Sequence, residues 1–197
     1  MRLKIGRVPE NAEFSPGETG WIPIKEPSPW IAQLLAFPIG VAVAWVMVFL
    51  WAQTGAKPRL ENPIFWLIVL IIGVFILHEI IHAIFHPRAG RSHKTIIGVW
   101  LSRGLFYAFY DDLCSRERFI VIILAPFVII SLVPLAGAFI VGGAPVQLAF
   151  VSVFNCLVSC MDILGAWLIM TRVPRNARVR NKGWRTYYKI VDARDGE

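Results

Sequence analysis

Four long runs of apolar residues, separated by polar segments, dominate the pattern of this chain. The runs cover about residues 31–52, 63–85, 119–141 and 147–170. Each is long enough to cross a hydrocarbon layer about 30 Å thick as a helix. The pattern predicts an all-α membrane protein with four transmembrane helices. A soluble helical core is the alternative, but uncharged runs of this length are rare outside membranes.

The polar segments between the apolar runs predict the organisation of the rest of the chain. We expect an N-terminal segment over residues 1–30, one transmembrane domain over 31–171 and a basic tail over 172–197. Between the second and third spans, two apolar, β-prone stretches flank Ser102-Arg103-Gly104. This arrangement favours a β-hairpin with Gly104 in its turn. An interfacial amphipathic helix over 96–109 is the competing interpretation.

Two prolines interrupt the third apolar run. Pro126 and Pro134 lie well inside it. A proline has no backbone N–H, so it bends a helix or leaves a carbonyl of the preceding turn without its partner. We expect the third span to be kinked or to offer free carbonyls to its neighbours.

Composition and charge support the membrane assignment and give it an orientation. The chain is 56% hydrophobic with a mean hydropathy of +0.60, above the range of ordinary soluble domains. The net charge is +7, and eighteen of the 20 Lys and Arg residues fall in the first, third and last polar segments. Only Lys57 and Arg59 lie in the other loops. The positive-inside rule therefore predicts cytoplasmic N- and C-termini, next to anionic lipid, and no nucleic-acid partner is expected.

The second apolar run carries the sequence H-E-x-x-H at His78, Glu79 and His82. On a helix, the two histidines share one face about 6 Å apart along the axis, and two imidazoles at that spacing can bind one zinc ion. The glutamate between them can act as general base for the attacking water. An ionised side chain inside a bilayer costs about 2.5–3.5 kcal/mol, so it usually has a partner or a function.

Asp162 is the best candidate for a third ligand. It and Glu79 are the only acidic residues of the four runs. Asn155, Ser159 and Asp162 form a polar stripe on one side of the fourth run, which should face the bundle interior. For Asn155 and Ser159, contact with the substrate or an oxyanion and an interhelical hydrogen-bonding seam are both open.

The other two histidines are weaker candidates for the site. His86 lies about 12 Å from His78 along a regular helix, which is too far to share one ion. It is expected to mark the end of the span, and His93 in the following loop stays open as a ligand. With the N-terminus inside, His78, His82 and Asp162 all fall in the cytoplasmic part of their spans.

These motifs resemble two related groups of proteins. An intramembrane "HEIIH" with an Asp on the second span after it looks like the site-2 protease group of zinc metalloproteases. Four spans, "HEIIHAIF", "LAPFVI" and "NCLVSCMDI" are similar to a zincin peptidase family of small multi-pass membrane proteins, over roughly residues 65–170. The site-2 protease pattern normally has Pro shortly after the Asn and Gly after the Asp. Here Val158 and Ile163 stand at or near those places.

Together, the motifs and the resemblance lead to a functional hypothesis. We expect an intramembrane zinc-dependent endopeptidase that hydrolyses a peptide bond in a membrane-embedded or membrane-proximal substrate. His78, His82 and Asp162 would hold Zn²⁺, and Glu79 would be the catalytic base. The small single-domain form suggests a prokaryotic cell membrane. The alternatives are a metal-ion transporter or sensor that uses the same ligands, and a non-catalytic membrane scaffold.

Overall fold

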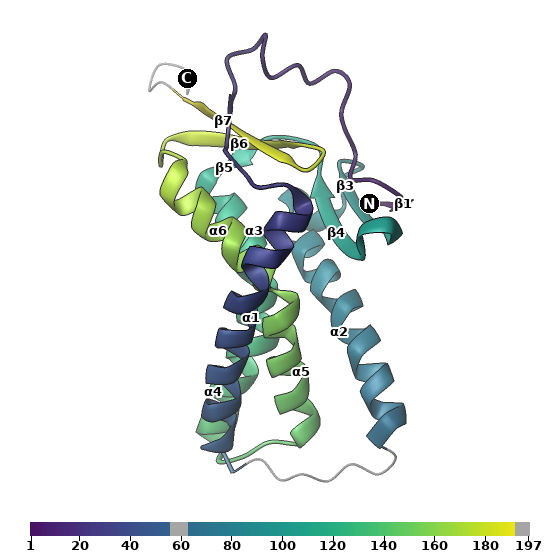
Figure 1. Ribbon diagram of the computed structural model, residues 1–197, viewed down its shortest axis with the longest axis vertical. Coiled ribbons are helices and arrows are strands. Elements are labelled where there is room, and N and C mark those ends of the chain that lie inside the picture. The colour runs from purple at the N-terminus through teal and green to yellow at the C-terminus, as the bar shows by residue number, and fades with distance from the viewer. Residues whose placement is uncertain (56–62, 192–197) are drawn as a thin grey trace.

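A bundle of long helices carries two small sheets at one end (Figure 1). The computed structural model describes residues 1–55 and 63–191, so Lys57, Arg59 and Arg194 lie outside the described residues. The helices are α1 (Pro29–Ala52), α2 (Pro63–Phe85), α3 (Arg116–Pro126), α4 (Val133–Val141), α5 (Val146–Val158) and α6 (Cys160–Arg172). The strands are β1 (Arg2–Ile5), β2 (Ile22–Pro23), β3 (Thr95–Trp100), β4 (Leu105–Tyr110), β5 (Cys114–Ser115), β6 (Ala177–Lys182) and β7 (Arg185–Ile190).

Among the described residues, three helices are long and apolar enough to cross a membrane, and up to four if one bent pair counts as a span. The three are Pro29–Ala52, Leu67–Phe85 and Arg116–Val141. The fourth predicted span is not one straight helix, because α5 and α6 meet at Ser159 with a bend of 51°. This bend places the start of α6 beside the end of α2.

The third span is interrupted at its prolines, as the sequence predicts. A π-helical segment, Phe127–Leu132, separates α3 from α4, and it begins directly after Pro126. Pro134 is the second residue of α4, and the chain is already helical at Leu132 and Val133 before it. The consequence for the site is a backbone carbonyl that is free in the turn before Pro126.

Helix α1 packs on the bend between α5 and α6 through a stripe of small residues. Ala32, Ala36, Gly40 and Ala44 recur every four residues and are buried, whereas Leu34, Trp45 and other large side chains of α1 are exposed. Small residues at this spacing let two helices approach closely. At Gly40 the approach is closest, because an added Cβ would lie 2.7 Å from the Cβ of Cys160.

Changing Gly40 to alanine should therefore destabilise the bundle. The new methyl group would push α1 away from Cys160, at a cost of about 1–3 kcal/mol for an overpacked contact. We expect the melting temperature of the purified protein to fall by several degrees. Gly73→Ala on α2 is the matched control, because an added Cβ there meets nothing within 4 Å. Equal melting temperatures for the two variants would contradict the close contact.

The predicted hairpin is confirmed, and it belongs to a three-stranded sheet. β3 and β4 pair antiparallel, and Gly104 takes a left-handed conformation with φ 59° at the turn. The strand order is β1-β3-β4, so β4 is an edge strand. The parallel pairing of β1 with β3 was not predicted.

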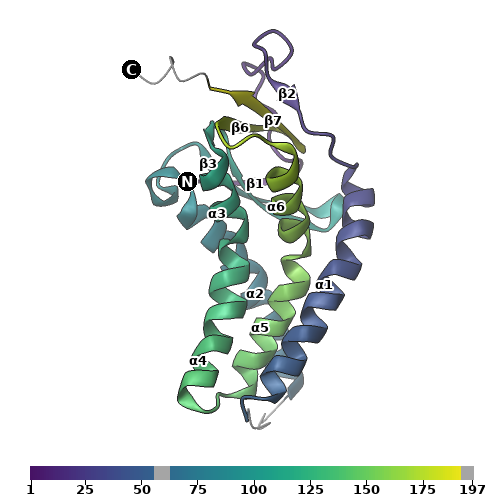
Figure 2. The ribbon, with the colours of Figure 1, turned by 90° about the vertical axis from the view of Figure 1, so that its left-hand side faces the viewer.

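A second sheet, also not predicted, has the strand order β2-β7-β6-β5. It joins the N-terminal segment, the segment after β4 and the tail, and it lies over the ends of α3 and α6 (Figure 2). The description of the chain as all-α is therefore too narrow. Alternating side chains on either side of a two-residue turn at Gly183-Trp184 were the available signal for the β6–β7 hairpin.

Candidate metal centre

Helices α2 and α6 bring the three predicted ligands to one point. His78 and His82 lie one turn apart on α2, and Asp162 lies in the first turn of α6. The two Nε2 atoms are 3.1 Å apart. Asp162 Oδ2 lies 3.0 Å from His78 Nε2, and Asp162 Oδ1 lies 3.4 Å from His82 Nε2. One ligand atom from each residue falls within 4.8 Å of the others.

Hydrogen bonds on the far side of each imidazole define its tautomer. His78 Nδ1 donates to Asn155 Oδ1 over 3.0 Å, and His82 Nδ1 donates to the carbonyl of Ile122 over 2.8 Å. A carbonyl oxygen can only accept, so both protons must lie on Nδ1. In the neutral rings, the Nε2 lone pairs of both histidines therefore point toward Asp162. A metal-binding histidine normally has this arrangement.

The three ligand residues fit a divalent cation. Two imidazole lone pairs and a carboxylate face one another at 3.0–3.4 Å, and Asp162 Oδ2 is buried without a hydrogen-bond partner. Acceptors this close repel each other unless a positive charge lies between them. Ligand atoms around a tetrahedral zinc ion, at bonds of about 2.0–2.2 Å, are themselves about 3.3 Å apart. The donor set of two histidines and one carboxylate is also one that zinc uses.

Glu79 lies beside the three ligands but is not one of them. Its side chain is buried, and its carboxylate accepts a hydrogen bond from the backbone N–H of Ala108 on β4. The second oxygen, Oε2, is buried without a hydrogen-bond partner. Because a buried carboxylate oxygen is costly when unpaired, this atom is available to a proton or a polar ligand.

Asn155 and Ser159 belong to a buried hydrogen-bond network behind His78. Asn155 Nδ2 lies within hydrogen-bond distance of the Pro126 carbonyl, Ser131 Oγ and Ser159 Oγ, at 3.1, 2.9 and 3.2 Å. The hydroxyls of Ser131 and Ser152 donate to each other's carbonyls. These bonds fix the amide so that Oδ1 accepts from His78. They favour a positioning role for Asn155, and its contact with a substrate stays a prediction.

The remaining histidines lie apart from this cluster. His86 follows α2 and is buried, with its Nδ1 3.3 Å from Thr95 Oγ1. Burial lowers the pKa of His86 to about 4, so it is neutral at neutral pH. The backbone carbonyl of His93 accepts a hydrogen bond from Arg2. Neither belongs to the cluster of three that the described residues form.

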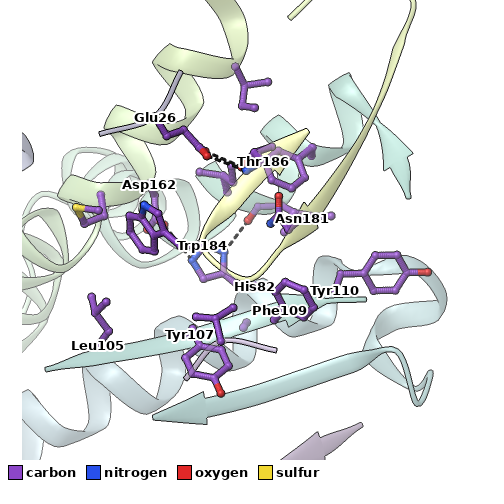
Figure 3. A pocket seen from close by; sticks show the side chains of 18 of the residues that line it. Glu26, His82, Leu105, Tyr107, Phe109, Tyr110, Asp162, Asn181, Trp184 and Thr186 are labelled. Carbon is purple, nitrogen blue, oxygen red and sulfur yellow. Dashed lines mark hydrogen bonds and ion pairs between the residues drawn. The ribbon is translucent and has the colours of Figure 1, made fainter. Parts of the chain in front are cut away.

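Two cavities meet at the cluster, and both are lined by Glu79 and Asp162. The first, of about 270 Å³, lies between the edge of β4 and the β6–β7 hairpin. Figure 3 shows Leu105, Tyr107 and Phe109 along β4 on one side, Trp184 and Thr186 on the other, and His82 between them. The second, of about 380 Å³, lies among α1, α2 and α5 and is lined by Phe37, Phe75 and Phe154.

Two contributions to the site could not be identified as functional from the sequence. One is the tail, whose β6–β7 hairpin forms a wall of the first cavity. The other is the turn around Pro126, whose carbonyls support both histidines. For the turn around Pro126, the sequence does indicate a free carbonyl, since Ile122 stands four residues before a proline inside a span. The partner of its free carbonyl is visible only in three dimensions.

An H-E-x-x-H helix, a carboxylate beside its two histidines and a buried glutamate make up the set of residues that zinc metallopeptidase sites use. Residues 71–178, more than half of the chain, match the family described as "Putative zincin peptidase", and the chain belongs to this family. Searches of curated proteins and of solved structures found no match. Family membership indicates a zinc metallopeptidase, and the cluster of His78, His82 and Asp162 could bind the metal.

Proposed function

We propose that this protein is a site-2-protease-like intramembrane zinc endopeptidase. His78, His82 and Asp162 would hold the metal, and Glu79 would be the general base. The observation that carries the proposal is the position of Glu79. Its carboxylate is buried, has one unpaired oxygen, adjoins three converging ligands and faces both cavities.

The metal and the residues of the chain would have separate roles in the hydrolysis. Zinc, when bound, would lower the pKa of its water to about 7 and polarise the scissile carbonyl. Glu79 would take the proton of the attacking water and later deliver it to the leaving amine. The hydrogen bonds to Asn155 and Ile122 would hold the two imidazoles in the ligand orientation during these steps.

The free edge of β4 suggests how a substrate could bind. Asp111 N–H donates to the Lys94 carbonyl, and hydrogen-bonded pairs alternate along an antiparallel ladder. By this alternation, the N–H and C=O groups of Phe106 and Ala108 point away from β3. Because the Ala108 N–H already donates to Glu79, an extended peptide could pair beside it with the N–H and C=O of Phe106 and the C=O of Ala108. A helical membrane segment would have to unwind locally before it could do so.

The proposed setting is a bilayer with the metal centre toward the cytoplasmic side. The three basic segments meet in the sheets at one end of the bundle, and the positive-inside rule would place that end in the cytoplasm. The second cavity, among α1, α2 and α5, lies on the side of the apolar helices. The substrate would be a membrane-embedded or membrane-proximal segment that passes from this cavity to the edge of β4.

Peptides with N-methyl groups test the proposed binding mode. Alternate N–H groups of an extended peptide point to the same edge, so one alternate set should pair with β4 and the other should not. Each backbone hydrogen bond contributes about 0.5–1.5 kcal/mol, so methylation of two N–H groups of the pairing set should raise KM about tenfold. Methylation of the other set should change KM less than about threefold.

The assay uses the purified protein in vesicles and an apolar peptide whose scissile amide stays unmethylated. Cleavage of the parent peptide should disappear with a zinc chelator and return with added zinc. Equal effects of the two methylated sets would contradict pairing along a single edge. If the chelator leaves cleavage unchanged, zinc-dependent hydrolysis is wrong.

A further inference from the structure

We propose that Pro126 is a positioning residue for the metal centre. Because it lacks a backbone N–H, it would keep the carbonyl of Ile122 free to hold His82, and its own carbonyl would support His78 through Asn155. The inference rests on the proposed metal site. It concerns a residue that touches neither the ligand atoms nor the substrate and acts only through the backbone.

Pro126 interrupts the backbone hydrogen-bond ladder of α3. In an α-helix the N–H of residue 126 would donate to the carbonyl of residue 122, and proline removes that donor. His82 Nδ1 donates to this carbonyl instead, over 2.8 Å. Ile122 and Pro126 are both buried, so water cannot readily replace the lost partner. Any other residue at 126 would supply an N–H that competes with His82.

The same turn of α3 also supports the other histidine, His78. The Pro126 carbonyl accepts from Asn155 Nδ2 over 3.1 Å, and Asn155 Oδ1 accepts from His78 Nδ1 over 3.0 Å. The π-helical segment starts at the next residue, so the turn at Pro126 lies where the regular ladder changes. Two carbonyls one helical turn apart thus support the two histidines: that of Ile122 contacts His82 directly, and that of Pro126 reaches His78 through Asn155.

Pro134 provides a matched comparison. It lies in the same interrupted span, eight residues further on, at the start of α4. The hydrogen bonds of His78, His82 and Asn155 go to other residues. A general effect of removing a proline from this span should therefore be common to both positions, whereas loss of histidine support should follow only from a change at Pro126.

The experiment compares Pro126→Ala and Pro134→Ala in the purified full-length protein. We expect Pro126→Ala to weaken zinc binding about 10–100-fold, the usual cost of losing an outer hydrogen bond to a ligand. Pro134→Ala should stay within about threefold of the wild type. Zinc affinity is measured by competition with a chromogenic chelator, and the melting temperature of each metal-free variant shows whether it folds equally well. Zinc affinity of Pro126→Ala within threefold of wild type would overturn the inference.

A second measurement uses the unmodified protein and so does not depend on the folding of a variant. The chain has 4 histidines, and their ring nitrogens can be labelled with ¹⁵N. In the metal-free protein, the neutral ring of His82 should carry its proton on Nδ1. A neutral ring with its proton on Nε2 and none on Nδ1 would show that the Ile122 carbonyl does not hold this ring. If the wild type bound no zinc at all, the proposed function would fail, while this measurement would still decide the arrangement at Pro126.

Discussion

Glu79→Gln should abolish peptide hydrolysis and leave zinc binding intact. Glutamine has nearly the same shape as glutamate but cannot accept the proton of the attacking water. General acid–base catalysis by one side chain contributes about 10²–10⁴-fold, so turnover should fall by that factor. Since Glu79 lies outside the cluster of three ligands, zinc content should stay that of the wild type. Turnover and zinc per chain are measured on the same preparation.

Glu26→Gln is the matched control for this experiment. Glu26 lines the same cavity, and burial raises the pKa of its carboxyl group. Its two oxygens, however, accept hydrogen bonds from the N–H and hydroxyl of Thr186, at 2.7 and 2.6 Å. A glutamine can keep both contacts, so turnover should change less than about threefold. Wild-type turnover in Glu79→Gln would rule out Glu79 as the general base. A wild-type protein that moves metal across the membrane but cleaves no peptide would favour a transporter.

Those parts of the fold that depend on local periodicity could be predicted from the sequence. The apolar runs, the positions of the prolines and the β-prone stretches around Gly104 each reflect a few neighbouring residues, and helices α1 and α2 and the β3–β4 hairpin follow them. The spacing of His78 and His82 belongs to the same kind of signal. Asp162 could be selected because acidic residues are rare in apolar runs.

The remaining features depend on contacts between segments far apart in the chain. β1 pairs with β3 more than ninety residues away, and β2 and β5 have only two residues each, too few for a periodic signal. The bend at Ser159 also escaped prediction, because α5 and α6 together read as one apolar run. The same bend brings Asp162 to the histidines. The sequence therefore predicts the candidate ligand but not the bend that positions it.

Asp162→Asn should remove zinc from the protein almost completely. The change deletes the negative charge from the ligand set and leaves two neutral imidazoles that face an amide. The loss of zinc affinity should exceed about 100-fold, the upper range for loss of an outer hydrogen bond. Hydrolysis should fall with zinc content. Bound zinc stabilises the folded state by mass action, so the melting temperature of the variant should no longer rise when zinc is added.

Asp112→Asn is the control, because Asp112 lines the same cavity but forms an ion pair with Lys94 outside the cluster. It should bind zinc as the wild type does.

The double variant His78→Ala/Asp162→Asn tests whether the two residues bind the same ion. If both residues hold one ion, the second change should cost little once the first has removed zinc, since coupled residues are not additive. Full zinc content in Asp162→Asn would contradict a single site. So would losses of zinc affinity that simply add in the double variant, because α2 and α6 would then bind metal separately or not at all.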